Sequence, residues 1–326
     1  MAQAPFTIQQ RLTQIALTYR NAALIADRVL PRIPVVSQAF KWSKFTVADG
    51  YSIPDTRVGR KSVVNQIDWT ATEQNDATLD YGLDDAIPLA DILTAQAAMD
   101  IQGVMPIDPE ARSTELLTSL VALDRENRVA NGSNGLFVLG TYPAANRSTL
   151  AGTTQWSDFT NSDPVQAILT ALDTPLVRPN VAIFGQAVWS KVRTHPKVTA
   201  AVYPSGGNAT GGGSAVSRQA FADLFELEEV LVGQSWYNTA KPGQTASMAR
   251  LWGKHAAFIY RSPNPLSTQG DVTFGFTAQW GDKVAGTIAD DPKIGLRGGT
   301  LVRVGESVKE VVAANDVAYF YQNAVA

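Results

Sequence analysis

Residues 108–131 contain the strongest structural signal in the chain, a long helix that is marked at both ends. Within "PIDPEARSTELLTSLVALDRENRVANGS", Asp108 suits an N-cap, Pro109 suits the first helical position, and Asn131-Gly132 suits a helix end. At about 1.5 Å per residue, such a helix is more than roughly 30 Å long. A helix of this length has to bury one stripe, so the segment predicts a structural spine that other elements cover.

The spacing of apolar residues predicts which side of this helix is buried. The members of the apolar stripe recur at i, i+4 and i+7 spacing and are Leu116, Leu117, Leu120, Val121 and Leu123. We expect this stripe to face a core. The charged residues expected to face elsewhere are Arg112, Glu115, Glu126 and Arg128.

Residues 35–74 have the pattern of a long two-stranded ribbon. Apolar and polar residues alternate from Ser62 to Thr72, and "VADGYSIPDTRVG" before them carries the Asp-Gly and Pro signals of a turn. A two-stranded ribbon is only marginally stable in water. Trp42, Phe45 and Trp69 therefore need a covering surface, either on the chain's own core or on a neighbouring molecule.

Charge is distributed unevenly in the first third of the chain. Residues 1–61 contain nine Lys or Arg and three acids, whereas residues 62–111 contain ten acids and no Lys or Arg. Such blocks either neutralise each other within one domain or suit head-to-tail contact between identical subunits. Only 17% of the residues are charged, below the roughly 25% of a typical soluble domain. This deficit fits either a surface that partners cover or a soluble surface rich in uncharged polar residues.

From about residue 160 onward, helix and strand patterns alternate. Helices are expected from Asp163-Pro164, over "QAVWSKVR" and from Ser217, and strands over "NVAIFG", "EEVLVGQ" and "ARLWGKHAAFIYRSP". The alternation predicts a compact α/β unit of roughly 130 residues. The end of the chain, "GGTLVRVGESVKEVVAANDVAYFYQNAVA", is β-rich and is expected to rejoin the sheet beside the long helix.

Catalytic and metal-binding signatures are absent from the sequence. It has no cysteine and no GxSxG motif, and neither His195 nor His255 has a His or Cys partner at metal-ligand spacing. The adjacent acids, which point to opposite faces if they lie on strands, are Asp84-Asp85, Glu228-Glu229 and Asp290-Asp291. We therefore expect no catalytic residue, no metal site and no cofactor.

Charge and hydropathy also indicate which partners and which cellular location suit the chain. Its net charge of −3 disfavours tight binding to DNA or to an anionic membrane. No apolar run approaches the roughly 20 residues of a membrane span. Zero cysteines and the lack of a leader-like start favour an unprocessed protein made in a reducing cytoplasm.

The stretch "YPSGGNATGGGSAVSRQ", residues 203–219, contains five glycines: Gly206, Gly207, Gly211, Gly212 and Gly213. A phosphate-binding P-loop ends in Gly-Lys-Ser/Thr and a dinucleotide loop has GxGxxG between a strand and a helix, and this stretch has neither. The helix start at Ser217 attracts an anion only weakly, and the nearest downstream cation is Arg218. The glycines therefore predict a flexible loop.

Taken in order, the basic N-terminal arm, the ribbon, the capped helix, the α/β unit and the β-rich end resemble the major capsid proteins of tailed bacteriophages. The stretch "EVLVGQSWYNTAKPGQTASMARLWGKHAAFIYRSP" is similar to the equivalent region of that family, with a strand ending in Gly, an Asn-bearing loop, and "LWG" leading into "AAFIY". The resemblance covers essentially the whole chain. It implies the Hong Kong 97-type capsid fold, of class α+β.

The resemblance also implies a division of the chain into five parts. They are an N-terminal arm at 1–34, an extended β-hairpin loop at 35–80, a peripheral domain at 81–154 with the spine helix at 107–131, an α/β axial domain at 155–290, and C-terminal strands at 291–326 that return to the peripheral domain. The glycine-rich loop then lies in the axial domain near the capsomer centre.

In such a protein, subunits form pentamers and hexamers that close into an icosahedral shell around double-stranded DNA, which they contact weakly and non-specifically. Further expected partners are scaffolding, portal and decoration proteins, with no membrane, and the expected location is the virion, assembled in the host bacterial cytoplasm. The implied subunit-interface candidates are Arg28, Arg32, Lys41, Trp42, Lys44, Phe45, Arg57, Arg60, Lys61, Trp69, Asp84 and Asp85. Some family members crosslink a loop lysine to an asparagine with the help of a glutamate, but no such asparagine or glutamate is identified here, so we expect no crosslink.

Two alternatives stay open on the sequence alone. One is an encapsulin, a bacterial compartment of the same fold that encloses a cargo enzyme. The other is an α/β enzyme that uses the carboxylates near Asp290 and Asp291.

Overall fold

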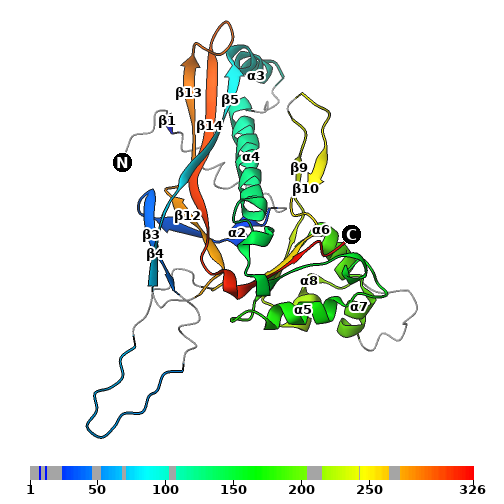
Figure 1. Ribbon diagram of the computed structural model, residues 1–326. Coiled ribbons are helices and arrows are strands. Elements are labelled where there is room, and N and C mark those ends of the chain that lie inside the picture. The colour runs from blue at the N-terminus through cyan, green and yellow to red at the C-terminus, as the bar shows by residue number, and fades with distance from the viewer. Residues whose placement is uncertain are drawn as a thin grey trace.

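The computed structural model describes residues 7–8, 12, 24–45, 53–67, 71–102, 108–203, 215–241, 243–263 and 272–326. Two sheets organise the molecule, and helix α4 (Pro109–Asn131) connects them (Figure 1). A loop that includes residues 53–67 extends away from the body. The molecule is therefore a body with one long appendage.

A six-stranded sheet is organised around its longest strand, β14 (Gly299–Val312). One edge of β14 pairs antiparallel with β5 (Leu79–Pro88) over ten residues. Along its other edge, β14 pairs first with β13 (Val284–Asp291) and then with β12 (Gly275–Trp280). The outer strands are β1 (Thr7–Ile8), antiparallel to β13, and β2 (Arg32–Val35), parallel to β12.

A five-stranded sheet forms the core of the other half. Its strands, in order across the sheet, are β6 (Arg147–Thr149), β15 (Ala318–Gln322), β11 (Ala256–Ile259), β7 (Val181–Gly185) and β8 (Glu229–Gly233). The helices that pack on one face are α5 (Pro164–Asp173), α6 (Gln186–Val192), α7 (Pro196–Val202) and α8 (Arg218–Phe225). This half combines a sheet with helices, as expected for the α/β unit, but it also includes β6 and β15 from outside residues 155–290.

Strand β7, which lies between β11 and β8, is buried on both of its faces. Ala182 and Phe184 pack into the core beneath the four helices, whereas Val181 and Ile183 pack into a second core. Because successive side chains of a strand point to opposite faces, a strand buried on both sides is a continuous apolar run, and "VAIFG" is one. The second core contains the C-terminal end of α4.

Helix α4 begins and ends where the sequence indicates. Asp108 caps it by accepting hydrogen bonds from the backbone of Glu110 (3.0 Å) and Ala111 (3.5 Å), Pro109 is its first residue, and Gly132 ends it. Its first half packs on the six-stranded sheet through Leu117, and its last turn packs in the second core. One helix thus contributes to both halves of the molecule (Figure 1).

The buried stripe of α4 differs from the predicted one. Leu117 and Val121 are buried, but Leu116 and Leu120 are 57% and 52% exposed. The other buried members of the stripe are Ser113, Thr114, Thr118, Arg125, Glu126, Val129 and Ala130. The expectation that Glu126 faces outward was wrong, because its side chain is hydrogen-bonded inside the protein.

The remaining described elements are short or lie apart from the two sheets. Strands β3 (Ala39–Phe45) and β4 (Ala71–Ala77) form an antiparallel pair, as do β9 (Trp236–Asn238) and β10 (Met248–Arg250). Helices α2 (Ala26–Val29) and α3 (Leu89–Gln102) precede α4. Four 3₁₀ turns cover Leu139–Thr141, Ala144–Asn146, Gly152–Thr154 and Asn315–Val317.

Three features differ from the sequence-based expectation. The alternating residues 62–67 form no strand, because no partner strand lies beside them in the described chain. Strands β12 and β13, expected in the α/β unit at 155–290, belong to the six-stranded sheet. The C-terminal strands at 291–326 were expected to return together to the domain of the long helix. Only β14 lies beside α4, whereas β15 lies in the five-stranded sheet.

Candidate interaction surfaces

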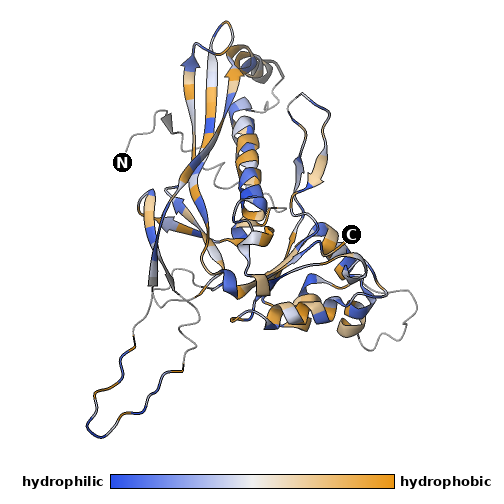
Figure 2. Ribbon diagram, in the orientation of Figure 1, coloured by the Kyte–Doolittle hydropathy of each residue, from blue (hydrophilic) through white to orange (hydrophobic). Residues whose placement is uncertain are grey.

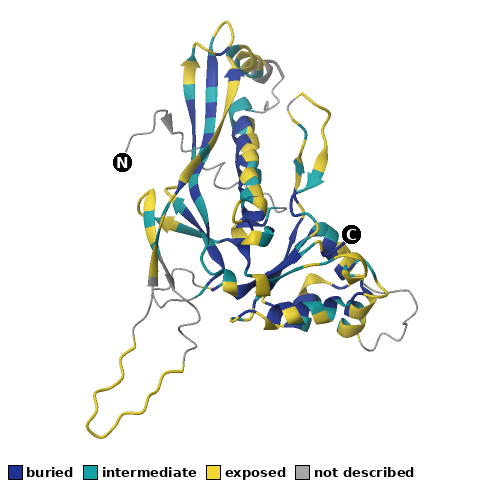
Figure 3. Ribbon diagram, in the orientation of Figure 1, coloured by how far each residue is buried: buried dark blue, intermediate teal, exposed yellow. Residues whose placement is uncertain are grey.

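The extended loop presents apolar side chains to solvent. Every residue from 53 to 67 is exposed (Figure 3). Ile53 is 98% exposed and Val63 is 85% exposed, and Val58, Val64 and Ile67 are also largely open to solvent. Scattered exposed apolar residues are ordinary, but five of them on one projecting segment indicate a contact surface.

Backbone and side-chain hydrogen bonds give this loop a local shape. The Asp55 carboxylate accepts from the backbone N–H of Arg57 (2.9 Å), and the Asn65 side chain donates across the loop to the Asp55 carbonyl (2.8 Å). Near the tip, the N–H of Ser62 donates to the carbonyl of Gly59 (3.0 Å). These bonds hold the two arms of the described loop together without a regular ladder.

The predicted loop cations Arg57, Arg60 and Lys61 are all exposed. Within the described part of the chain, none of the three makes an ion pair. The loop therefore combines apolar and positively charged groups on one segment, a composition suited to an apolar surface with acidic surroundings.

The base of the loop packs on the chain's own sheet. Trp42 of β3 meets Phe276 of β12 edge-on, with ring centroids 6.2 Å apart, and its indole N–H donates to Asp76 of β4 (2.9 Å). Lys41 pairs across the two strands with Glu73 (3.2 Å). Trp42 thus has part of its cover within its own molecule. Lys44 and Phe45 lie in β3, but their side chains and the whole of Trp69 lie outside the described residues.

Arg32 lies in an ion-pair network within the chain. Its guanidinium contacts Asp27 and the buried carboxylate of Glu306, each at 2.7 Å. Arg125 also pairs with Asp27. Burial opposes ionisation of Asp27, but the charges of Arg125 and Arg32 outweigh it and lower its pKa to about 2.

Arg28 also pairs internally. It contacts Glu229 at the start of β8, which Arg261 contacts as well (2.9 Å). Burial of Glu229 is outweighed by these two arginines, so its pKa lies below the ordinary value. Arg28 and Arg32 therefore fasten β2 and the segment before it to the two sheets of their own subunit.

Asp84 and Asp85 likewise have partners within the chain. Asp84 accepts two hydrogen bonds from Arg303 of the neighbouring strand, at 2.6 and 2.7 Å. Asp85 accepts from the Ser113 hydroxyl of α4 (2.6 Å). These contacts hold β5 to β14 and to α4. The predicted charge blocks are thus partly neutralised within one subunit.

The carboxylate of Glu126 is the polar centre of the interior and was missed by the sequence-based reasoning. It is fully buried and accepts from the backbone N–H groups of Ile25 (3.0 Å) and Ala26 (2.8 Å) and from the Trp252 indole (2.6 Å). Burial raises its pKa more than these hydrogen bonds lower it. The residues it joins are roughly a hundred or more positions away, so no local pattern indicates them.

Two further apolar surfaces lie on rigid elements. Leu116 and Leu120 lie one turn apart on α4, and each is more than half exposed. Hydrophobic and hydrophilic residues both occur along this helix (Figure 2). Trp236 and Met248 are exposed on the hairpin of β9 and β10, where the Arg250 guanidinium lies 4.2 Å from the Trp236 ring centroid. These positions extend the set of candidate contacts beyond those predicted from the sequence.

The histidines of the chain lie in hydrogen-bonded surroundings, and the Nε2 of His195 lies 3.1 Å from the hydroxyl of Ser162. In the described ranges, no group of three His, Asp or Glu side chains could hold a metal ion. His195 is buried, its Nδ1 accepts from the N–H of Lys197 (3.2 Å), and burial lowers its pKa. His255 accepts from the N–H of Asn323 (3.1 Å). Both histidines hold backbone segments in place.

Two predictions from the sequence remain, the flexible glycine-rich loop and the lack of a membrane span. The glycines of the predicted flexible loop, Gly206 to Gly213, lie outside the described residues. In the portion of the chain that is described, every helix is too short or too polar to cross a bilayer.

Comparison with known proteins places the chain in a family. No protein-family model matches it. A protein named "Major capsid protein" from Pseudomonas phage JBD67 is 46% identical over 327 residues, covering 100% of both chains. The chain belongs to the major capsid proteins of tailed phages.

Solved structures agree with this assignment at the level of the fold. A phage-related protein from Bordetella bronchiseptica RB50 superposes with a TM-score of 0.73 at 22% identity, covering 99% of this chain and 98% of the other. The capsid structure of the Cyanophage P-SCSP1u gives a TM-score of 0.57 at 11% identity, covering 99% and 92%. The fold is the Hong Kong 97-type capsid fold.

Membership of this family also bears on the location of the protein and on the alternative functions. A phage capsid protein is a component of the virion. Neither the compartment protein nor the carboxylate enzyme is favoured over this family. Asp290 and Asp291, the proposed enzyme residues, lie at the end of β13 and belong to no metal-binding group in the described chain.

Proposed function

We propose that this capsid protein builds an icosahedral shell from pentamers and hexamers, in which the extended loop of each subunit lies on its neighbour. The single observation that carries this proposal is the loop itself. It exposes Ile53, Val63 and Val64 on a segment that extends away from its own core (Figure 3). In an assembly of identical subunits, every loop lies beside the same surface of a neighbouring subunit, so that surface can cover it each time.

We assign the parts of the subunit as the sequence predicts, except that each strand is assigned to the sheet in which it lies. Residues 1–34 act as an arm, residues 35–80 as the extended loop, α4 with the six-stranded sheet as the peripheral domain, and the five-stranded sheet with its helices as the axial domain. Support comes from the internal ion pairs of Arg28 and Arg32, which fix the described part of the arm on its own subunit. Arg57, Arg60 and Lys61 are then the loop cations available to a neighbour.

The role is structural and not catalytic. Double-stranded DNA is enclosed and contacted weakly and non-specifically, as the net charge of −3 favours. Scaffolding, portal and decoration proteins are further partners, and assembly takes place in the host cytoplasm.

The test replaces the loop's apolar groups while keeping the fold. Burying a Val or Ile side chain is worth about 1.5–3 kcal/mol. The triple variant Ile53→Asn, Val63→Asn, Val64→Asn should therefore weaken each loop contact by up to about 5–9 kcal/mol. We expect folded subunits that no longer close into shells, as seen by electron microscopy and sedimentation.

A matched control uses polar positions of the same loop. Thr56→Asn with Gln66→Asn should assemble normally, since neither position contributes apolar surface. Normal shells from the triple variant would show that the loop does not bridge subunits. Loss of shells in both variants would show that the loop's apolar groups are not the cause.

A further inference from the structure

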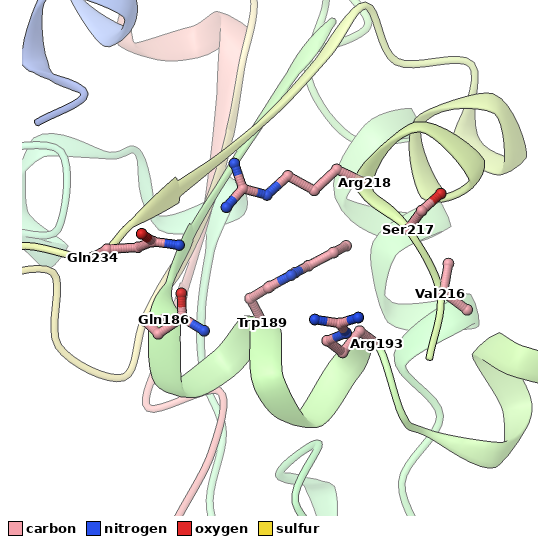
Figure 4. A pocket seen from close by; sticks show the side chains of 7 residues that line it. All are labelled: Gln186, Trp189, Arg193, Val216, Ser217, Arg218 and Gln234. Atoms are coloured by element: carbon pink, nitrogen blue, oxygen red, sulfur yellow. The ribbon is translucent and has the colours of Figure 1, made fainter. Parts of the chain in front are cut away.

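A small polar pocket lies between α6, α8 and the end of β8. Its volume is about 140 Å³, and its lining residues are Gln186, Trp189, Arg193, Val216, Ser217, Arg218 and Gln234 (Figure 4). A water molecule occupies roughly 10–15 Å³ of such volume, so the pocket has room for a small polyatomic ligand. It lies in the α/β half, apart from the extended loop.

Two arginines, Arg193 and Arg218, give the pocket a positive charge. Figure 4 shows the Arg218 side chain on one side of the Trp189 ring and Arg193 on the other. No carboxylate lines the pocket, and neither arginine makes an ion pair with a described residue. Two guanidinium groups that line one pocket without an acid attract an anion.

The pocket is built by contacts that do not depend on a ligand. The N–H of Val216 donates to the carbonyl of Arg193 (2.9 Å), which joins the end of α6 to the start of α8. Ser217 caps α8 by accepting from the N–H of Ala220 (3.1 Å). Trp189 is almost fully buried and forms a rigid wall. Both arginine backbones are therefore held in place before anything binds.

One buried donor at this site lacks a partner. The Nε of Arg193 is buried and makes no hydrogen bond with a described group, and the Oε1 of Gln186 is in the same state. A buried polar atom without a partner costs about 1–3 kcal/mol. A ligand that accepts from Arg193 and donates to Gln186 removes both deficits.

We propose that this pocket binds a single phosphate group. Phosphate fits better than a carboxylate because it carries nearly two negative charges at neutral pH, which match two guanidinium groups, and a carboxylate matches only one. Its oxygens accept from both arginines, and a protonated oxygen donates to Gln186. The ligand that meets these requirements is the free phosphate anion. A nucleic-acid backbone shares the anionic oxygens, but each phosphodiester carries one charge and has no protonated oxygen to donate.

The test measures phosphate binding to the full-length subunit by calorimetry, at constant ionic strength with chloride as the reference. The wild type should bind inorganic phosphate saturably. Arg218→Gln should weaken this binding by about tenfold or more, since it removes one charge-assisted contact. Arg218→Lys should lie between the two, because it keeps the charge and loses the planar fork.

The double variant Arg193→Gln, Arg218→Gln should bind no phosphate, and Arg112→Gln on the exposed side of α4 serves as the matched control with unchanged binding. Circular dichroism and the urea midpoint check that each variant is folded. Arg218 is exposed, so its single variant keeps the test valid if the double variant unfolds. Absence of saturable binding in the wild type, or equal affinity in folded Arg218→Gln, would overturn the proposal.

A second arm identifies the source of the phosphate. A short DNA duplex is titrated into the wild type and the variants, with and without inorganic phosphate. Loss of duplex binding in Arg218→Gln, together with competition by phosphate, would assign the site to a DNA backbone and overturn the proposal of a free anion. Unchanged duplex binding assigns it to a free anion. Shell assembly does not enter either readout, so this result is independent of the loop experiment.

Discussion

Replacing Glu126 tests how the interior of the subunit is held together. The variant Glu126→Ala removes one carboxylate and leaves three buried donors without a partner, namely the N–H groups of Ile25 and Ala26 and the Trp252 indole. Each unsatisfied donor costs about 1–3 kcal/mol. Because burying the carboxylate has its own cost, which its raised pKa reflects, we expect a net loss of about 3–5 kcal/mol.

Glu126→Gln provides the graded comparison. The amide keeps the size of the side chain and one acceptor oxygen, but turns an N–H₂ group toward the donors. We expect a smaller loss of about 1–2 kcal/mol. The free energies come from urea unfolding of the full-length subunit at a concentration too low for assembly, followed by circular dichroism.

The order of the two variants is the decisive readout. A folded domain has only about 5–15 kcal/mol of stability, so Glu126→Ala should be close to unfolding at elevated temperature. If Glu126→Ala remained within about 0.5 kcal/mol of the wild type, the carboxylate would not be the polar centre that the hydrogen bonds describe.

Three further predictions concern stability and assembly. Asp27 has a pKa lowered from 3.8 to about 2, so its contribution is present above pH 3.8 and is lost as pH falls through about 2; acid titration of Asp27→Asn should lack this part of the stability decline. Gly233→Ala would place a Cβ 2.1 Å from the Trp252 ring, so urea unfolding should show a loss of about 1–3 kcal/mol or more, and an unchanged midpoint would contradict this. Leu116→Asn with Leu120→Asn should lower the unfolding free energy by no more than about 1 kcal/mol, the helix-propensity cost of two exposed positions, but should reduce shell yield if this face contacts a neighbour.

The local signals in the sequence were sufficient for individual elements. Helix α4 was predicted from its caps, which act within a few residues, and the helices and strands of the α/β unit were predicted from short patterns of the same kind. Such signals depend on neighbours in the chain. Physical reasoning from one sequence can therefore find them.

Features that depend on distant residues were not predictable in this way. The stripe Leu116, Leu117, Leu120 gives no sign that its buried side continues through Arg125 and Glu126. The groups that bond to these two side chains come from residues 25–30, Trp252 and Thr277, all far away in the sequence. The alternation at residues 62–67 predicted a strand, but a strand needs a partner, and none lies beside it in the described chain. The same limit explains β15, whose place between β6 and β11 follows from tertiary pairing alone.

Of the predicted interface residues, some are exposed and others are paired within their own chain. Exposure of Arg57, Arg60 and Lys61 agrees with their position in a projecting loop. Arg32 and Asp84 were chosen from the same charge blocks, yet they pair with Glu306 and Arg303 of their own chain. Charge blocks in a sequence indicate that partners exist, and only the fold shows whether those partners belong to the same subunit.

Cryo-electron microscopy of shells assembled from the full chain tests the bridging role of the extended loop most directly. We expect residues 53–67 of each subunit to lie on an adjacent subunit, with Ile53, Val63 and Val64 buried there. Shells in which this loop stays exposed to solvent, or folds back on its own subunit, would contradict it.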